Sequence, residues 1–260
     1  MMENLEIHLD QDIHKINNLR DFILNNYSLL ISTVEIIAAV AAIIVYRRYK
    51  QTKVKYFLFF LVYVAILEII GGYPEVVANY EVLKPIKEFL KGTWAEQNYW
   101  WYNIFWKIVA PLFYSYYFKI NIDTKWSQKT INVLQIIFLA SAITYIAIYP
   151  NELFDNSIVF NTVIGSFLVL VSIALYFIEL LRSELLMSFY KAINFYIASI
   201  VFIWYLVVTP LVFYNIYFST ADWSFVLLRW EVFFIMNSFM YLSFAVALIF
   251  CKPEKDYKID

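Results

Sequence analysis

Four ionisable side chains interrupt stretches of sequence that are otherwise apolar: Glu35, Glu68, Lys107 and Glu231. A charge in such surroundings loses several kcal/mol of hydration, so it is retained where it binds something or where an opposite charge compensates it. Three carboxylates and one ammonium can hold a proton, a small cation or a small polar ligand. They can equally form ion pairs that join helices, and Lys107 with Glu35 or Glu68 is the pairing that their positions favour.

Amide side chains lie close to these charges, with Asn103 before Lys107 and Asn237 after Glu231. If each stretch crosses a membrane as a helix, a rise of about 1.5 Å per residue puts Glu35 about 10 Å and Lys107 about 12 Å below the same surface. The sequence thus predicts an outward-facing polar cavity, and its candidate ligand-binding or ion-coupling residues are Glu35, Glu68, Lys107, Glu231, Asn103 and Asn237. In the alternative, these groups only join helices and Glu231 pairs with Arg229 at the surface.

Several kinds of chemistry lack the residues that they need. The two His, His8 and His14, and every Asp lie outside the apolar stretches, which excludes bis-His haem, intramembrane zinc or Ser–His hydrolysis and paired catalytic aspartates. No Lys lies between Trp230 and Cys251 to bind retinal, and no glycine-rich nucleotide loop or basic nucleic-acid surface is present. We therefore expect no catalytic residue, no metal, no cofactor and no nucleic-acid partner, and a protein that is not an enzyme.

The elements that carry the candidate residues are seven apolar stretches. The chain is 62% hydrophobic and 16% charged, whereas a soluble domain is about 45–50% apolar and about 25% charged. Each stretch approaches or exceeds the roughly 20 residues that a helix needs to cross the hydrocarbon layer. The stretches are residues 28–46, 56–72, 99–118, 130–149, 158–181, 192–213 and 229–251. We predict an all-α fold, a polytopic bundle of seven transmembrane helices over residues 28–251.

The distribution of Lys and Arg predicts the orientation of the bundle. With seven spans and the N-terminus outside, thirteen basic residues lie on the inner side and six on the outer side, in agreement with the positive-inside rule. The third stretch, 99–118, is the least regular because it is rich in aromatic residues and contains Lys107 and Pro111. Without it, every later segment would be inverted and the charge bias weakened, so we predict that it crosses.

The remaining segments are short. Residues 1–27 have apolar side chains at helical spacing between acidic ones, which predicts an amphipathic helix on the membrane surface or one that caps the bundle. The connection 73–98 keeps helical spacing around Pro85, so we predict an outer interfacial helix that lies over the mouth of the bundle. Residues 252–260 form a cytoplasmic tail, so any function is carried by the bundle or by a partner.

Short motifs occur in four of the stretches. They are Tyr102-Asn103-Ile104-Phe105, Tyr116-Tyr117-Phe118-Lys119, Ile164-Gly165-Ser166-Phe167, Tyr176-Phe177-Ile178-Glu179-Leu180-Leu181 and Asn194-Phe195-Tyr196, together with Asn237. Over residues 55–250 this pattern resembles a family of small bacterial seven-transmembrane-helix proteins for which no activity is established. The resemblance implies a multi-pass bundle in a bacterial inner membrane. The N-terminal segment and the connection 73–98 depart from the family pattern.

Two functions fit these features, and a third fits less well. The leading hypothesis is a non-enzymatic receptor-like protein or envelope-complex subunit, embedded in the lipid bilayer, that binds a small ligand in its outward cavity and passes a signal to a membrane or cytoplasmic partner protein. The alternative is a small ion or solute channel or a proton-coupled transporter that uses Glu35 or Glu68; unbroken helices and the lack of internal repeats weigh against it. An intramembrane enzyme would have to work with Glu and Lys alone.

Overall fold

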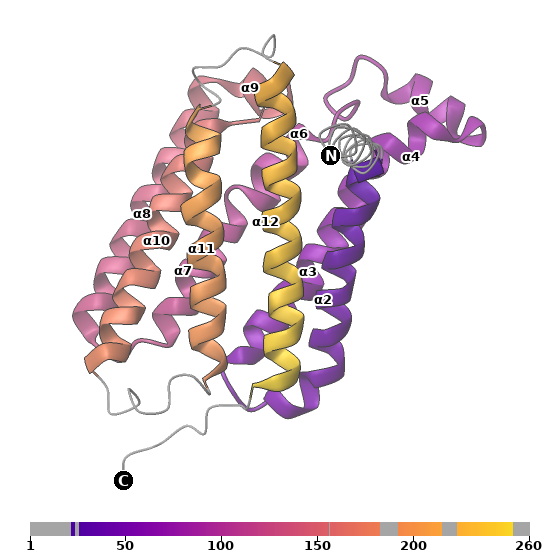
Figure 1. Ribbon diagram of the computed structural model, residues 1–260. Coiled ribbons are helices and arrows are strands. Elements are labelled where there is room, and N and C mark those ends of the chain that lie inside the picture. Colours follow the sequence, from indigo (N-terminus) through magenta and orange to yellow (C-terminus); the bar gives the residue numbers. More distant parts are fainter. Residues whose placement is uncertain (1–21, 24–25, 156, 183–191, 215–222, 252–260) are drawn as a thin grey trace, which may run out of the picture.

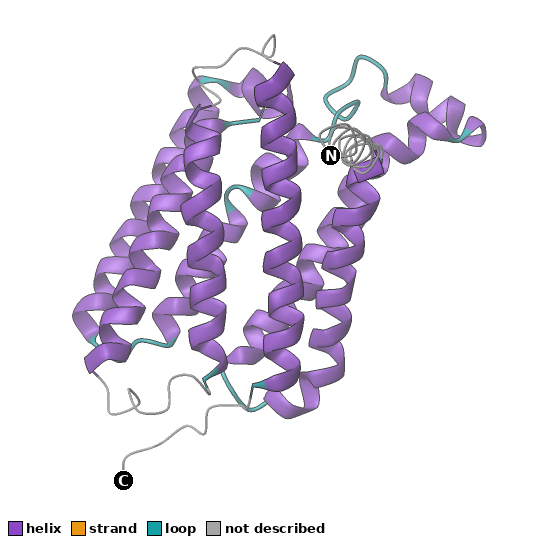
Figure 2. Ribbon diagram, viewed as in Figure 1, coloured by secondary structure: helices purple, strands orange, loops and turns teal. Residues whose placement is uncertain are grey.

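The computed structural model describes residues 22–23, 26–155, 157–182, 192–214 and 223–251, and within these ranges the chain is all-α with no strand (Figures 1 and 2). The predicted cytoplasmic tail and all but a few residues of the predicted amphipathic segment 1–27 lie outside the described residues.

Within the described ranges, six helices are long and apolar enough to cross a membrane: α2 (Tyr27–Tyr49), α3 (Val54–Gly71), α8 (Lys125–Ile148), α10 (Val159–Arg182), α11 (Ile193–Tyr214) and α12 (Trp223–Phe250). Their bounds agree with six of the predicted stretches to within a few residues, apart from an earlier start of α12. Large apolar side chains cover their outward faces, among them Ile44, Ile136 and Leu181. Such a surface is stable in lipid, where the hydrogen bonds within a helix satisfy its backbone N–H and C=O groups. The chain is therefore a multi-pass integral membrane protein.

The third predicted stretch is a broken helix. It consists of a short helix α6 (Tyr99–Trp101), a π-helical turn η2 (Tyr102–Trp106) and α7 (Val109–Ile120), with an interruption at Lys107 and Ile108 that Figure 2 shows as a short loop inside the bundle. The Lys107 amide donates to the Tyr102 carbonyl, five residues earlier, at 3.0 Å. Because Pro111 has no N–H to donate to the Lys107 carbonyl, the regular hydrogen-bond ladder cannot continue across this point.

The broken segment nevertheless runs along the whole of α3, in the opposite direction. Three side-chain hydrogen bonds connect the two segments near the α6 end: Asn98 Nδ2 donates to the Gly71 carbonyl (2.7 Å), Trp101 Nε1 to the Leu67 carbonyl (3.0 Å) and Tyr63 Oη to the Phe105 carbonyl (2.8 Å). Two ring contacts continue the seam toward the other end. Phe60 and Phe113 stack at 4.0 Å, and Tyr56 and Tyr116 meet edge to face. The Tyr63 bond satisfies a carbonyl in the turn just before the interruption.

The order of the helices in the bundle brings the first and the last together. α2 lies between α3 and α12, α11 joins α12 to α10, and α10 also packs on α7 and α8 (Figure 1). At one end of the bundle, near the short helix α9 (Pro150–Asp155), the rings of Tyr27 and Trp230 lie 5.1 Å apart. At the other end, Tyr49 Oη donates to the Cys251 carbonyl at 2.7 Å. α2 and α12 are therefore parallel, and we call the two ends the α9 end and the Cys251 end.

The connection after α3 is an arm that projects sideways from the α9 end (Figure 1). It comprises α4 (Tyr73–Asn79), the 3-10 turn η1 (Glu81–Leu83) and α5 (Lys84–Leu90), none of which buries a residue. The prediction of one helix lying over the mouth of the bundle is wrong on both points. Pro74 and Pro85 favour helix starts and so divide the segment, and its helices contact one another and the end of α3.

Candidate functional site

The two carboxylates of α2 and α3 meet inside the bundle. Glu35 is only 6% exposed, Glu68 is partly buried, and the Glu68 carboxylate is close enough to act electrostatically on Glu35. Tyr102 Oη donates a hydrogen bond to Glu68 Oε2 at 3.0 Å. The hydroxyls of Tyr114 and Tyr241 face the same region, with Tyr241 beside Glu35. We call these five residues the acid site.

Small residues position the acid site. Ala38, Ala39 and Ala42 are buried on α2 and allow its neighbours to approach closely around Glu35. Gly71 does the same at the end of α3, because a Cβ atom there would lie 2.8 Å from the Tyr102 hydroxyl oxygen, well inside van der Waals contact. The absence of a side chain at Gly71 is thus what allows Tyr102 to reach Glu68.

Three polar atoms of the acid site have no hydrogen-bond partner among the described residues. They are Glu35 Oε2 and the hydroxyl oxygens of Tyr114 and Tyr241, and all three are shielded from solvent. The Tyr241 hydroxyl is close enough to influence the Glu35 carboxylate, but the geometry of a hydrogen bond between them is incomplete. Leaving a buried polar group unpaired costs about 1–3 kcal/mol, and more for a charged one. A proton, a small cation or an ordered water bound between these atoms would recover that free energy.

No cationic side chain of the described residues faces the carboxylates of the acid site. Neither Glu35 nor Glu68 forms an ion pair with any residue that the structure describes, and the two carboxylates repel each other in surroundings of low polarity. Such a pair is stable when it shares a proton or a cation. Hard carboxylate and hydroxyl oxygens suit a proton or an alkali cation better than a transition metal, and within the described ranges no group of three His, Cys, Asp or Glu side chains gathers that could hold a metal.

Lys107 does not belong to the acid site, so the predicted Lys107–Glu35 or Lys107–Glu68 pair is wrong. Its ammonium donates to Asn103 Oδ1 at 3.0 Å, to the Ser157 hydroxyl and, at 3.5 Å, to the Ile158 carbonyl. The reason is the direction in which each side chain leaves the broken segment. Tyr102 faces α3, its neighbour Asn103 faces α9 and α10, and Lys107, one turn further on, shares the face of Asn103.

Asn103 is the centre of this second cluster, which we call the lysine site (Asn103, Lys107, Ser157 and Ile158). Its side chain is 1% exposed, donates to the Leu153 carbonyl at 3.0 Å and accepts from the Ile158 amide at 3.0 Å. It therefore ties the π-helical turn to α9 and to the start of α10. No carboxylate of the described chain compensates Lys107.

The two other predicted site residues lie apart from the acid site. Asn237 accepts a hydrogen bond from Trp204 Nε1 at 2.8 Å and so joins α12 to α11. Glu231 is partly exposed and lies ten residues before Tyr241 on α12, which at the rise of an α-helix is about 15 Å along the axis. The single outward cavity of six residues is thus replaced by two separate charged sites.

Three tyrosines of the acid site were missed by the reasoning from sequence. Aromatic residues near the ends of membrane-spanning stretches usually anchor the helix at the interface, so their presence does not indicate a buried site. Tyr241, however, lies near the middle of its predicted span 229–251, where a hydroxyl needs a polar neighbour, whereas Tyr114 lies four residues before the end of its span 99–118. A tyrosine in the middle of a span was therefore the sequence feature that could have indicated a buried polar site. Tyr102 lies near the start of its span and carried no such signal.

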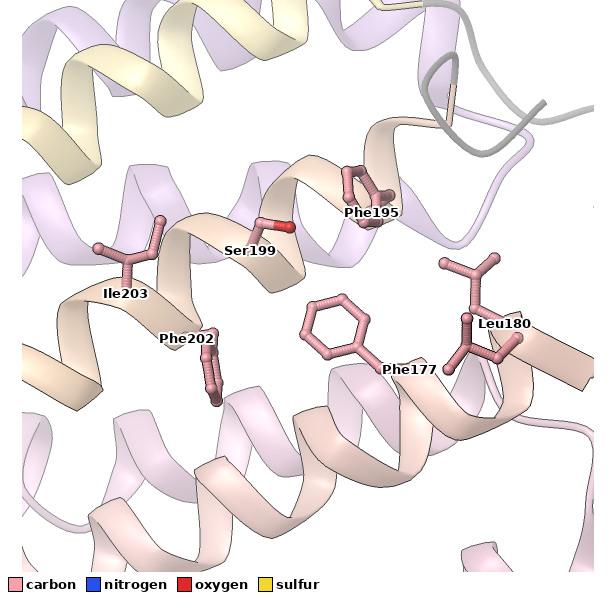
Figure 3. Close-up of a pocket in the computed structure, with 7 residues that line it drawn as sticks. Phe177, Leu180, Phe195, Ser199, Phe202 and Ile203 are labelled. Atoms are coloured by element: carbon pink, nitrogen blue, oxygen red, sulfur yellow. The ribbon is translucent and has the colours of Figure 1, made fainter. Parts of the chain in front are cut away.

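A groove between α10 and α11 near the Cys251 end is apolar and unlike the predicted polar cavity. Its volume is about 500 Å³, and Figure 3 shows Ser199 as the one polar side chain among those drawn. The lining residues are Phe177, Leu180, Leu181, Phe195, Ser199, Phe202 and Ile203. With no charged group, the groove offers nothing for ion or acid–base chemistry.

The fold and the acid site define a helical multi-pass membrane protein with uncompensated carboxylates in its core. No protein-family model, no curated protein and no solved structure matches the chain. The resemblance to the bacterial seven-span family therefore stays a prediction.

Proposed function

We propose that this protein binds a proton or a small cation at the acid site and acts as an ion channel or proton-coupled carrier. The observation that carries the proposal is the proximity of two carboxylates, the buried Glu35 and the partly buried Glu68, to the hydroxyls of Tyr114 and Tyr241, which complete no hydrogen bond among the described residues. A static helix-joining role would call for a cation or a complete set of hydrogen bonds around these carboxylates. The protein is not an enzyme in this proposal.

The proposal includes seven membrane crossings. α2 and α12 are parallel. Because the chain reverses direction at each crossing, a helix parallel to α2 can follow it only after an even number of further crossings. The six apolar helices supply five of these after α2, and the broken segment beside α3 supplies the sixth. The positive-inside rule then assigns the Cys251 end to the cytoplasm and the N-terminal side of α2 to the outside. We place the protein in a bacterial inner membrane on the resemblance.

The interruption of the third segment supports transport. π-helical turns are frequent at functional sites, and broken helices are common where transporters bind ions. Here Tyr102 holds Glu68 while the adjacent Asn103 holds α9 and α10. When Glu68 gains a proton or a cation, its hydrogen bond from Tyr102 weakens, because bonds to a charged acceptor are the stronger ones. The π-helical turn then loses its contact to α3 while it keeps its contacts to α9 and α10. Because this contact depends on the state of Glu68, the binding of a proton or a cation can favour a second arrangement of the helices.

The receptor-like or envelope-complex function is the second candidate. It is favoured by the lysine site, where the ammonium of Lys107 has neutral acceptors only and its weakest contact, to the Ile158 carbonyl, is 3.5 Å long. A small anionic or polar ligand at the α9 end would compensate that charge. In this function, binding would change the packing of α9 and α10 against the third segment, and a partner protein would receive the signal.

Flux measurements distinguish the two candidates. Purified protein is reconstituted in liposomes containing a pH-sensitive dye, and proton uptake is followed under imposed Na⁺, K⁺ and voltage gradients. We expect flux with the wild type, little or none with Glu35→Gln or Glu68→Gln, and unchanged flux with Glu231→Gln, a matched carboxylate outside the acid site. Equal flux in all three variants, or none in the wild type, refutes transport. A ligand that stabilises the wild type but not Lys107→Met would then support the receptor-like function.

A further inference from the structure

The arm formed by α4, η1 and α5 exposes large apolar side chains. Val82 is 88% exposed and Phe89 80%, and Val76, Tyr80 and Ile86 are also open. Soluble surfaces rarely leave such side chains uncovered in one short segment. Exposed apolar side chains gathered in this way are typical of a surface that contacts lipid or another protein.

The exposed residues from Val82 onward are sorted onto two faces. At about 100° per residue, Phe89, Val82, Ile86 and Leu90 fall within an arc of about 100°. Lys87, Lys91 and Lys84 lie on the opposite side, and the acids Glu88 and Glu81 follow on one flank of the lysines. A narrow apolar stripe opposite a face of mixed charge is the pattern of a helix that lies in the plane of a membrane interface.

The position of the arm places it at that interface. It begins directly after Gly71, where the membrane-spanning helix α3 ends, and it projects to the side of the bundle (Figure 1). Its base is held at this level because the Tyr73 hydroxyl donates to the carbonyls of Ala95 (2.6 Å) and Gln97 (3.0 Å). These bonds join the base of the arm to the segment that leads into α6, and so fix where the arm leaves the bundle.

From these observations we propose that the arm is a lipid-binding element that lies in the headgroup layer beside the bundle. Val82, Ile86 and Phe89 enter the edge of the hydrocarbon, and Lys84, Lys87 and Lys91 contact headgroup phosphates. Lys side chains suit this position because their apolar stems lie along the interface while the ammonium groups reach the phosphates. The proposal does not depend on the function of the acid site.

Site-directed fluorescence tests the proposal. In a Cys251→Ser background, single cysteines replace Phe89, Val82 or Lys87, each is labelled with the fluorophore NBD, and the full-length protein is placed in phosphatidylcholine nanodiscs. Quenching by doxyl-labelled lipid is compared with quenching by aqueous iodide. We expect the labels at 89 and 82 to be quenched several-fold more strongly by lipid than by iodide, and the label at 87 to show the reverse. The Cys251→Ser protein without a new cysteine gives the background.

Two outcomes would overturn the proposal. If iodide quenches all three labels equally, the arm lies in water. If neither quencher reaches positions 82 and 89, protein covers the stripe, either a second copy of this chain or another partner. Two reporters on the apolar face ensure that a local defect at one substituted position does not decide the result.

Discussion

The hydrogen bond between Tyr102 and Glu68 is the contact whose removal tests the acid site most directly. Tyr102→Phe deletes one hydroxyl and leaves the ring in place, so the change is confined to the bond that Oη donates to Glu68 Oε2 at 3.0 Å. Tyr63→Phe is a matched control on the same seam, since its hydroxyl donates at 2.8 Å to the neutral backbone carbonyl of Phe105.

The magnitudes expected for the two variants differ because one acceptor is charged. Side-chain hydrogen bonds inside membrane proteins contribute about 0.6 kcal/mol on average and up to about 1.7 kcal/mol, and bonds to charged groups are the stronger ones, at about 1.5–3 kcal/mol in soluble proteins. We therefore expect Tyr102→Phe to lower the free energy of unfolding by about 1.5 kcal/mol and Tyr63→Phe by about 0.6 kcal/mol.

Reversible unfolding in mixed micelles, followed by circular dichroism, measures both values, and a double-mutant cycle with Glu68→Gln isolates the charged part. In the Glu68→Gln background the cost of Tyr102→Phe should fall to that of a neutral bond, about 0.6 kcal/mol. The reasoning fails if Tyr102→Phe costs no more than Tyr63→Phe, or if its cost is the same with glutamine at position 68.

Three further predictions follow from the packing. Gly71→Ala should destabilise the protein by about 1–2 kcal/mol despite the better helix propensity of Ala, because the new Cβ atom collides with the Tyr102 hydroxyl. Gly72→Ala should be neutral or stabilising in the same unfolding assay, because its Cβ atom would lie 3.5 Å from the nearest backbone atom. Asn103→Ala should lower the free energy of unfolding by about 2–4 kcal/mol, since it leaves several buried groups unpaired. Lys107→Met should change it by less than about 1 kcal/mol, because the variant also removes a desolvated charge. Equal losses of stability for the two variants in calorimetry would contradict this reasoning. Burial raises the pKa of the Cys251 thiol, so at neutral pH a smaller fraction of it is thiolate than in a free thiol. Maleimide labelling of the folded protein should therefore be slow at pH 7, should still accelerate at pH values above the usual pKa of a thiol, and should become fast in denaturant. A labelling rate equal to that of free cysteine at pH 7 would refute the shift.

Much of the architecture was predictable because membrane insertion depends on local properties. The bounds of α2, α3, α8, α10 and α11 follow from the length of each apolar stretch, since a helix satisfies its own backbone and needs no distant partner to be stable in lipid. The third segment was predicted at nearly the right position. Its interruption was only partly visible in advance, because Pro111 indicates a kink but does not specify a π-helical turn.

The sequence by itself determined that this is a membrane protein of apolar helices, that Glu35, Glu68 and Lys107 are the charges which need an explanation, and that the apolar stretches contain no His. Only the tertiary structure decided how those charges are grouped. The rotation of each helix about its axis is set by packing against its neighbours, so depth alone could not separate Lys107 from the carboxylates. Adjacent residues of the π-helical turn point in different directions, so Tyr102 reaches Glu68 while Asn103 reaches α9 and the start of α10. The predicted site residues Glu35, Glu68 and Lys107 are therefore divided between an acid site and a lysine site.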